Sequence, residues 1–550
     1  MPAHQPERRR FLASAAALSV AASASWLGYR YLNRPPTVSL VKAGLPAGHM
    51  LRDGSLNRPP ESEHTCETLV LGSGAAALSA AWYLARHGHN NFLLAEGFER
   101  NGNNAAYTAH GLYAPTGAHY LAQPSAESVY VRAMLEEFGI IEGYGADGRP
   151  VYSDTDLVNA PDERLFYQGR WQHALLPAQD QDSRRFFALV QSLKTLRGSD
   201  GRKVFAIPVA LSSQDSRWRA LDTQTFAQWL DAEGYRSPTL RWYLDYCCRD
   251  DYGQSAGHVS AFAGLHYFAA RGNREDASVL TWPDGLNHLS ERLRRAARLQ
   301  TLERQPENRE WSFRLPAGLD AAAVRISENA DAVSVLLRHN VSGRTVRIAA
   351  KNLICAMPLN VAARITEQPE RYGFSPRPAG EHAPWLVSNF VLRGFPPETG
   401  RSELAWDNIV HGSGGLGYVC ATHQHIYVAK PEYTLFTAYT ALDNAPPAEV
   451  RRRLLTAEAR DLIEPAAQDL LAVYGRRLWR HVEHIAITAR GHAMSVPQPG
   501  YLSRSDLAAL RRHRSRIVFA HSDLSGYSVF EEAVYWGVEA AKKILDGRAA

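Results

Sequence analysis

Residues 67–96 read ETLVLGSGAAALSAAWYLARHGHNNFLLAE, in which two short apolar runs enclose a glycine-rich turn and a helix-like apolar pattern. The first run, 68–71, is typical of a buried parallel strand. Gly72, Gly74 and Ala77 follow it as G-x-G-x-x-A. The first small residue permits a tight turn, the second lets the backbone approach a pyrophosphate, and the third lets the helix pack close to the strand. The pattern predicts a dinucleotide-binding turn.

The rest of this stretch completes a β-α-β unit. We expect a helix over 75–87 that points its N-terminal N–H groups and positive dipole end at the phosphates. Gly88 would end this helix, and 92–95 would form the second strand. Glu96 then stands where an acidic side chain accepts hydrogen bonds from a ribose diol. Because strand, turn, helix, strand and acid occur in this order, a dinucleotide site is favoured over a turn that binds nothing.

The N-terminal residues indicate export. Arg8 and Arg9 begin R-R-x-F-L, and an Ala- and Ser-rich stretch with an A-x-A cleavage candidate at 22–24 follows. This pattern is typical of a twin-arginine signal, so we interpret 1–30 as a signal read by the twin-arginine (Tat) translocase and expect a periplasmic protein. The alternative is an uncleaved anchor that associates with the membrane, because 11–29 carries no charge and is nearly long enough to span a bilayer.

Length and composition permit a large enzyme. With 550 residues the chain is long enough for two domains with substantial cores. Its formal net charge of +5 is too balanced to indicate nucleic-acid binding. The five Cys residues show no C-x-x-C and no metal-ligand spacing, so we expect neither a metal site nor a fold that depends on disulfides. Residues 31–63 contain several Pro and Gly and no sustained apolar period, and are interpreted as a linker.

The residues after the β-α-β unit, Glu99-Arg100-Asn101-Gly102, resemble a family segment. Together with the unit they are similar to the opening of the FAD-dependent amine oxidase and phytoene desaturase superfamily. In that family the segment runs along the ribityl and phosphate groups of the flavin. The resemblance implies FAD as the cofactor, with Arg100 and Gly102 among its contacts. The chain departs from the family pattern at Asn103 and Asn104, where a Gly and an Arg are usual.

Three later segments extend the resemblance. LTWPDGLNHLSERL at 280–293 is similar to the W-P-x-G segment that leads into a helix of the family's FAD domain. The strands expected over 324–358 resemble the part in which a Val backbone contacts adenine, which implies that role for Val324. RIVFAHSDLSGYSVFEEAVYWGVEAAKKIL at 516–545 resembles the C-terminal segment that closes over the flavin.

The C-terminal segment implies two further cofactor contacts. Asp523 matches the acid that bonds the ribityl chain, and Ala533 matches a small residue near the flavin pyrimidine ring. His521 and Glu532 stand where the family usually has Gly.

The spacing of these segments predicts an interleaved α/β architecture. An FAD/NAD(P)-binding domain of the Rossmann-like, glutathione-reductase type would be built from 64–125, 277–360 and 490–550. A mixed α+β substrate domain would be built from 126–276 and 361–489. Such an arrangement places the substrate pocket at the domain interface, facing the flavin.

The resemblance also implies the chemistry. Hydride would pass from a substrate C–H bond to flavin N5, and the protein would position the substrate and exclude water. His119 and Tyr120 lie in the segment expected to pass the flavin ring, and Tyr527 lies in the C-terminal segment; these three are the predicted catalytic-zone residues. The usual Tyr of the family's aromatic pair would fall at Val529, two residues after Tyr527.

Three functions remain open at this point. The favoured one is an exported FAD-dependent oxidase or dehydrogenase of a small amine, polyamines included. The second is a flavin dehydrogenase or desaturase of an apolar or cyclic substrate, and the third is a non-catalytic flavin-binding partner protein. Asp250 and Asp251 are candidate paired carboxylates for proton transfer, although an ion-paired surface is the favoured interpretation. His266 is interpreted as a core histidine rather than a flavin contact.

Overall fold

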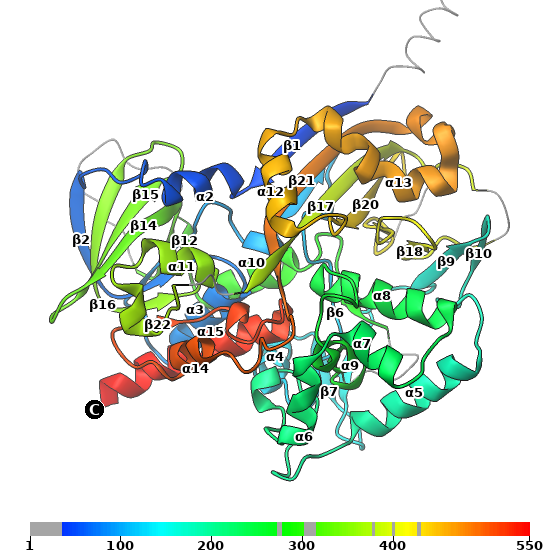
Figure 1. The fold of residues 1–550 in the computed structure, drawn as a ribbon. Helices are drawn as coiled ribbons and strands as arrows, with labels where there is room; N and C mark the ends of the chain where they lie inside the picture. The colour runs from blue at the N-terminus through cyan, green and yellow to red at the C-terminus, as the bar shows by residue number, and fades with distance from the viewer. Residues whose placement is uncertain are drawn as a thin grey trace, which may run out of the picture.

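A computed structural model describes residues 36–271, 278–301, 315–376, 380–398, 402–425 and 431–549. The predicted signal and its twin arginines lie outside these residues. Two domains lie side by side, each built on a mixed sheet with helices against it (Figure 1). Within the part of the chain that is described, we find no helix with the length and apolar character needed to cross a bilayer.

The first domain contains the predicted β-α-β unit: β2 (Ser62–Leu71), α3 (Ala75–Arg86) and β3 (Phe92–Ala95). β2 and β3 are parallel, and β16 continues the sheet on the other side of β2. The sheet has eight strands, with β22 paired to β16 and the others in the order β12-β13-β3-β2-β16-β15-β14. The further strands are β12 (Gln300–Thr301), β13 (Ala317–Leu319), β14 (Ala321–Glu328), β15 (Val333–His339), β16 (Thr345–Cys355) and β22 (Ile517–Phe519).

Two helices pack with α3 in the core of this domain, α10 (Asn287–Ala296) and α15 (Phe530–Ala549). The α3 sequence is rich in alanine, which allows close approach of the neighbouring helix. A Cβ atom at Gly537 of α15 would lie 2.2 Å from the carbonyl oxygen of Ala76. The contact therefore requires a glycine, and it joins the N-terminal helix of the unit to the last helix of the chain.

The second domain is built on another eight-stranded sheet, in the order β1-β21-β17-β20-β19-β18-β9-β10. Helices α12 and α13 pack on one apolar cluster of the sheet, and α5, α7, α8 and α9 contribute to another. The elements are β1 (Thr37–Ala43), β9 (Glu163–Tyr167), β10 (Arg170–Gln172), α5 (Gln181–Lys194), α7 (Phe226–Ala232), α8 (Pro238–Tyr252), α9 (Ala261–Ala269), β17 (Glu381–Arg393), β18 (Asp407–Val410), β19 (Tyr418–Cys420), β20 (Tyr433–Ala441), α12 (Pro447–Thr456), α13 (Ile463–Tyr474) and β21 (Val482–Val496).

Shorter elements connect the two domains and line their interface. They are α2 (Leu45–Arg52), β4 (Ala106–Ala109), β5 (Leu112–Pro115), β6 (Tyr120–Leu121), α4 (Val129–Glu137), β7 (Ile141–Tyr144), β8 (Pro150–Tyr152), α6 (Ser216–Arg219), β11 (Leu280–Thr281), α11 (Leu359–Ile365) and α14 (Ser505–Arg512).

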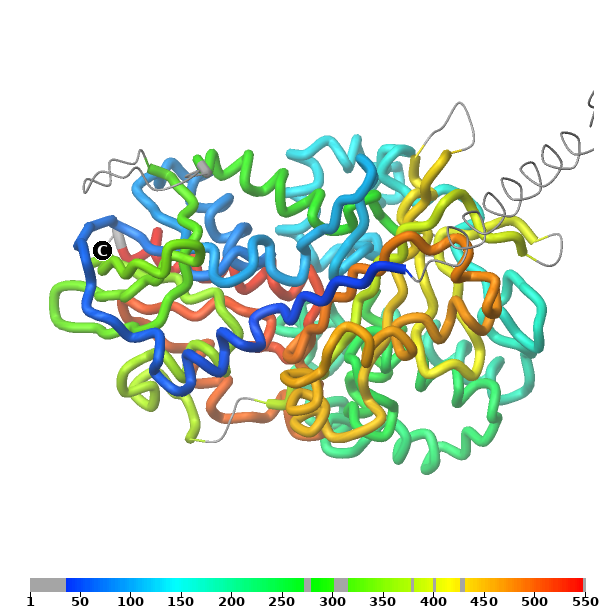
Figure 2. The backbone as a smooth tube through the Cα atoms, turned by 90° about the horizontal axis from the view of Figure 1, so that it is seen from above, coloured from blue at the N-terminus to red at the C-terminus, as the bar shows by residue number. Residues whose placement is uncertain are grey.

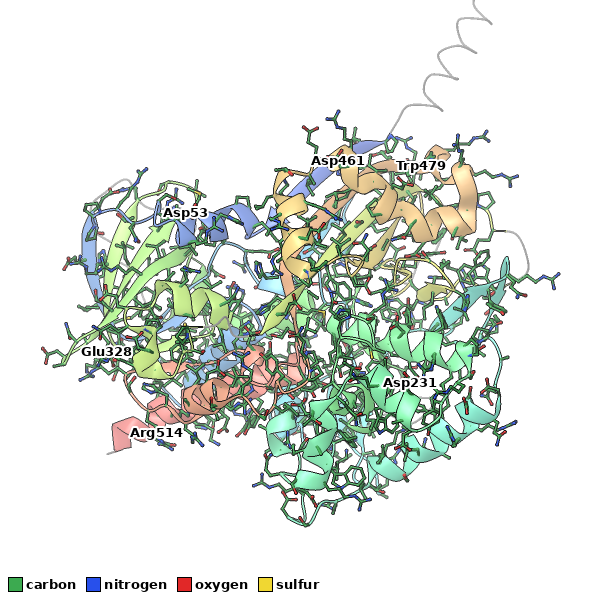
Figure 3. All side chains as sticks on the ribbon, viewed as in Figure 1. Asp53, Asp231, Glu328, Asp461, Trp479 and Arg514 are labelled. Atoms are coloured by element: carbon green, nitrogen blue, oxygen red, sulfur yellow. The ribbon has the colours of Figure 1, made fainter. Side chains whose placement is uncertain are left out.

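The linker predicted over 31–63 is wrong for most of its length. β1 pairs in parallel with β21 over seven residues, and α2 then leads toward the first domain. Figure 2 shows this segment, in dark blue, crossing from one domain to the other. α2 ends near Asp53 over the first domain, whereas β1 contacts the 3-10 turn that carries Asp461 (Figure 3). An edge strand with alternating exposed residues has no long apolar run, so its sequence resembles a linker.

Two predicted domain boundaries also shift. α4, β7 and β8 pack into the core of the first domain, although 126–276 was assigned to the second. Residues 490–496, assigned to the first domain, are the end of β21 in the second sheet. Both differences occur where the chain passes from one domain to the other. The end of β21 lies at this interface.

Candidate functional site

A cavity of about 430 Å³ lies where the two domains meet. Its walls come from the turn before α3, the loop after β3, the segment before β6, strand β21 and the start of α15. α2 contributes Leu51, and α8 contributes Asp250 and Asp251. The predicted residues Gly72, Gly74, Glu96, Gly102, His119, Tyr120, Asp523 and Ala533 all line it.

The turn before α3 has the geometry that a dinucleotide requires. Gly72 has a φ of 107°, and a Cβ atom there would lie 2.9 Å from the carbonyl oxygen of Ala356. Ala77 lies behind Gly72, at 3.8 Å from that Cβ position, and does not line the cavity. A Cβ atom at Gly74 would meet nothing within 4 Å, and no side chain caps α3 there. The first-turn N–H groups of α3 therefore remain available to an anion such as a diphosphate.

Glu96 is held in place by an arginine that the sequence did not single out. The carboxylate is 6% exposed and accepts two hydrogen bonds from Arg294 of α10, at 2.6 Å between Nη1 and Oε1. Arg294 also donates from Nε to Asn101 Oδ1 at 2.7 Å. A carboxylate has about four lone-pair positions, so Glu96 keeps acceptor capacity toward a ribose. Its predicted role fits this geometry.

Two more predicted cofactor residues lie outside the cavity, as Ala77 does. Arg100 points to the surface, where its Nη2 lies 3.1 Å from Glu291 Oε1, because the chain reverses at Asn101 with a φ of 63°. Val324 is buried, but the cavity is lined by Ala322 and Ala323 instead. An irregular register between β14 and β15 after Ala323 displaces the following side chains from the expected alternation.

Asp523 is fully buried and is surrounded by hydrogen-bond donors. Its carboxylate accepts from the Leu359 N–H at 2.9 Å and from the Ser495 hydroxyl at 2.5 Å, and His382 Nε2 lies 3.3 Å away. Burial alone would raise the pKa of this carboxyl, but the neighbouring His521 and His382 hold it well below its ordinary value. Asp523 is therefore an ionised acid at the cavity wall, fixed by side chains from both domains.

His119 and Tyr120 belong to an aromatic wall of the cavity. The His119 ring stacks on Tyr439 at 4.4 Å between centroids and lies 5.5 Å from Trp406. Tyr120 meets His119 edge-on at 5.0 Å, and Trp385 adds an indole to the lining. Burial lowers the pKa of His119 to about 3, so this imidazole is neutral at physiological pH. The wall offers ring faces rather than a charged proton donor.

Tyr527 does not belong to the site, contrary to the prediction. It is 1% exposed and packs in the core of the second domain, with its ring 4.8 Å from that of His266. The cavity is lined by the three residues that follow, Ser528, Val529 and Phe530. His266 is a core histidine as expected, with Nε2 2.8 Å from the carbonyl oxygen of Ala206.

The sequence analysis named Asp250 and Asp251 as candidates but favoured a surface position for them, which is wrong. Asp251 is buried and forms an ion pair with Arg271, which is half-buried and also lines the cavity. Asp250 lines the cavity, and among the described residues we find no hydrogen-bond or ion-pair partner for it. Burial and the like charge of Asp251 raise the pKa of Asp250 to about 7, against the opposing effect of the Arg271 charge. The helical spacing of Leu244, Cys247, Cys248 and Asp251 on the buried face of α8 is a signal that could have placed Asp251 inside.

Two more acids lie on neighbouring strands of the second sheet. Asp407 of β18 and Glu163 of β9 are register partners on parallel strands, so their side chains point to the same face. Burial and the nearby Asp250 raise the pKa of Asp407 well above its ordinary value. Neither acid lines the cavity, and Glu163 is exposed, but the charge of Asp407 interacts with that of Asp250.

Comparison with known proteins agrees with this geometry. A family model described as an NAD(P)-binding Rossmann-like domain matches residues 70–138. No curated protein matches the chain. Among solved structures, a double mutant of putrescine oxidase with a redesigned cofactor site aligns with a TM-score of 0.61 at 16% identity, covering 88% of this chain and 100% of that one.

Two other solved structures align with slightly lower TM-scores and similar coverage. Cyclohexylamine oxidase from Brevibacterium oxydans IH-35A gives a TM-score of 0.58 at 16% identity, covering 88% of this chain and 100% of that one. A CLA-producing fatty acid isomerase from P. acnes gives a TM-score of 0.56 at 15% identity, covering 86% of this chain and 97% of that one. The predicted fold class is confirmed. The chain has a Rossmann-like dinucleotide-binding domain interleaved with a second α+β domain.

Proposed function

We propose that this protein is an FAD-dependent oxidoreductase that oxidises the C–H bond next to nitrogen in an amine. The observation that carries the proposal is Asp250, a carboxylate without a partner among the described residues, in a cavity that also has a dinucleotide end and an aromatic wall. An unpaired carboxylate away from bulk water is costly, and a cation relieves that cost. A substrate ammonium group beside Asp250 and the ring faces of Tyr120 and Tyr439 fits this chemistry.

The residues at the other end of the cavity fit FAD. The N-terminus of α3 offers N–H groups to a diphosphate, Glu96 offers acceptors to a ribose, and the open space before Gly74 admits the backbone approach. When bound, FAD supplies the hydride acceptor. The protein's own part is to hold the reacting carbon in position and to exclude water.

The protonation states suit an amine substrate. His119 is neutral, so the aromatic wall does not add a proton to a nitrogen lone pair that must be free for oxidation. Asp250, with a pKa of about 7, is ionised in mildly alkaline solution and then attracts the ammonium form on binding. The charge of Asp407 interacts with that of Asp250, which favours an amine with a second cationic nitrogen, such as a polyamine.

The similar structures support an amine substrate and also supply a second candidate. Putrescine oxidase and cyclohexylamine oxidase are amine oxidases by name. The fatty acid isomerase shares the fold, and Ile207, Val387 and Met494 give part of the cavity an apolar lining. An apolar substrate is therefore the second candidate function, but it would leave Asp250 unpaired.

The decisive experiment is anaerobic reduction of the bound flavin. We expect the purified protein to be yellow, to release FAD on denaturation, and to bleach with a primary amine or polyamine. Fatty acids and cyclic hydrocarbons serve as the comparison panel. If an apolar compound bleaches the flavin and no amine does, the second candidate function is favoured. If neither class bleaches it, a non-catalytic flavin-binding partner is favoured.

We further propose that the protein is exported by the twin-arginine translocase and acts in the periplasm, on the support of Arg8, Arg9 and the Ala-rich stretch after them. FAD is made inside the cell, so a cofactor-loaded protein suits a route that carries folded proteins. Retention of the N-terminal segment as a membrane anchor is the alternative outcome of fractionation.

A further inference from the structure

Strand β21 belongs to the second sheet but forms part of the cavity wall. Arg490, His492, Ala493, Met494 and Ser495 of this strand all line the cavity. The backbone of Arg490 is fixed on both sides, since Arg490 is the register partner of Ala43 in β1 and of Trp385 in β17. Arg490 is 5% exposed, so its side chain leaves the second sheet and enters the first domain without reaching solvent.

The guanidinium of Arg490 binds two loops of the first domain. It forms a two-point ion pair with Glu99, at 2.7 Å from Nη1 and 2.9 Å from Nη2. It also donates to the carbonyl oxygen of Thr116 at 2.9 Å from Nε, to Asn103 Oδ1 at 3.1 Å, and to the Thr116 hydroxyl at 3.2 Å. These bonds use all five N–H groups of the side chain. Arg490 therefore has no donor left for a cofactor and acts on the loops instead.

These two loops line the cavity. Residues 99–104, apart from Arg100, and residues 117–118 form part of its wall together with the turn before α3. They are in tight contact: Ala118 N–H donates to the carbonyl oxygen of Asn103 at 2.8 Å, and a Cβ atom at Gly117 would lie 2.1 Å from that oxygen. A change in one loop is therefore transmitted to the other.

Among the residues that the structure describes, no cation of the first domain pairs with Glu99. The neighbouring Arg100 pairs with Glu291 of α10 on the outer side. A second contact also joins the 99–104 loop to the second domain: Asn103 Nδ2 donates to the carbonyl oxygen of Ala493 in β21 at 2.7 Å. Both contacts tie these loops to the second domain, in addition to the bonds that hold the 99–104 loop in its own domain through Asn101 and Asn104.

We propose that Arg490 is a positioning residue for the cofactor, which fixes the loops at 99–104 and 116–118, so that contact with the second domain helps to set the binding shape of the dinucleotide end of the cavity. The proposal rests on FAD as the ligand under the proposed function. It concerns the cofactor and not the amine, so the two can fail separately. Loss of Arg490 would loosen FAD even in a protein whose substrate remains unidentified.

The test compares Arg490→Gln with Arg100→Gln in the holoprotein. Arg100→Gln is the matched control, because it removes an arginine–glutamate pair from the same loop on the side away from the cavity. We expect Arg490→Gln to release FAD at least about tenfold faster, the size of effect that loss of one or two charged hydrogen bonds produces, and to change the visible circular dichroism of the bound flavin. Arg490→Lys should restore part of the retention, and Arg100→Gln should behave as wild type.

Glu99→Gln removes the same ion pair by changing its other partner, and it replaces Arg490→Gln in the test if that variant does not fold. If the Arg490 and Glu99 variants release FAD at the wild-type rate and show the wild-type flavin dichroism, but melt at a lower temperature, the proposal is overturned. Arg490 would then have a purely structural role. Release that is faster in Arg100→Gln than in Arg490→Gln would also overturn it. A wild-type protein that binds no FAD would instead refute the proposed function.

Discussion

Replacement of Asp250 by Asn removes one negative charge from the cavity and almost no volume. If Asp250 pairs with a substrate ammonium group, the variant loses that pairing while the aromatic wall and the dinucleotide end stay intact. Asp250 is only partly buried, so the low end of the range for breaking a ligand charge pair applies, about 2 kcal/mol. This corresponds to roughly 30-fold weaker binding of the cationic amine.

The same substitution has the opposite effect on stability. The pKa of Asp250 rises from 3.8 to about 7 in the folded protein, so the folded state binds the proton more tightly than the unfolded state does. Stability therefore falls as the pH rises from about 4 to about 7, and the loss is fully present above that interval. Its upper limit is about 4 kcal/mol, which water in the cavity reduces. Asp250→Asn removes this cost and should raise the melting temperature at about pH 8, with little change near pH 4.

Two measurements check this reasoning. Anaerobic stopped-flow reduction of the flavin at increasing amine concentration separates substrate affinity from the limiting rate, and thermal unfolding at the two pH values gives the stability change. Asp251→Asn is the matched control: it leaves the half-buried Arg271 without its ion-pair partner and should destabilise the protein. Unchanged amine affinity in Asp250→Asn, or a lower melting temperature in mildly alkaline solution, would refute the assignment of Asp250 to substrate binding.

Three further outcomes are expected. Gly74→Val should fold with an unchanged apoprotein melting temperature but bind no FAD, as judged by absorbance after purification, because its side chain would enter open cavity space without touching protein atoms. Tyr527→Phe should leave both flavin reduction and thermal stability as in wild type, because the Tyr527 hydroxyl has no hydrogen-bond partner among the described residues; slower reduction would return Tyr527 to the site. Changing Arg8 and Arg9 to Lys should keep the protein, with its flavin, in the cytoplasm on fractionation, and normal export would rule out the twin-arginine route.

The parts of the fold that depend on neighbouring residues were predictable from sequence. The β-α-β unit is local, and each of its glycines has a steric reason that a single sequence displays, such as the positive φ of Gly72. β1 could not be recognised in the same way, because its partner β21 lies more than four hundred residues away and the strand itself is half exposed.

The candidate site divides along the same line. His119 and Tyr120 lie in the segment that leads directly from the dinucleotide turn, and the structure places them at the cavity. Arg490 and Asp250 come from the other domain, and nothing local to either residue shows that it reaches the cavity. The predictions for Val324 and Tyr527 were wrong by small displacements. A register irregularity in β14 displaces Val324, and Tyr527 lies just before the residues ahead of α15 that line the cavity. Sequence spacing locates a segment more accurately than it locates the side chain that faces a ligand.

The contact between α3 and Gly537 of α15 has a consequence for biosynthesis. The dinucleotide turn is synthesised early, but α15, which packs against α3, is synthesised much later. While α15 is still inside the ribosome, the nascent chain has the turn but lacks both Ala533 and this supporting helix. Domains fold as units once their sequence has emerged, so we expect flavin to be captured only after α15 has left the ribosome. We therefore expect ribosome-bound chains that end before α15 to carry no flavin.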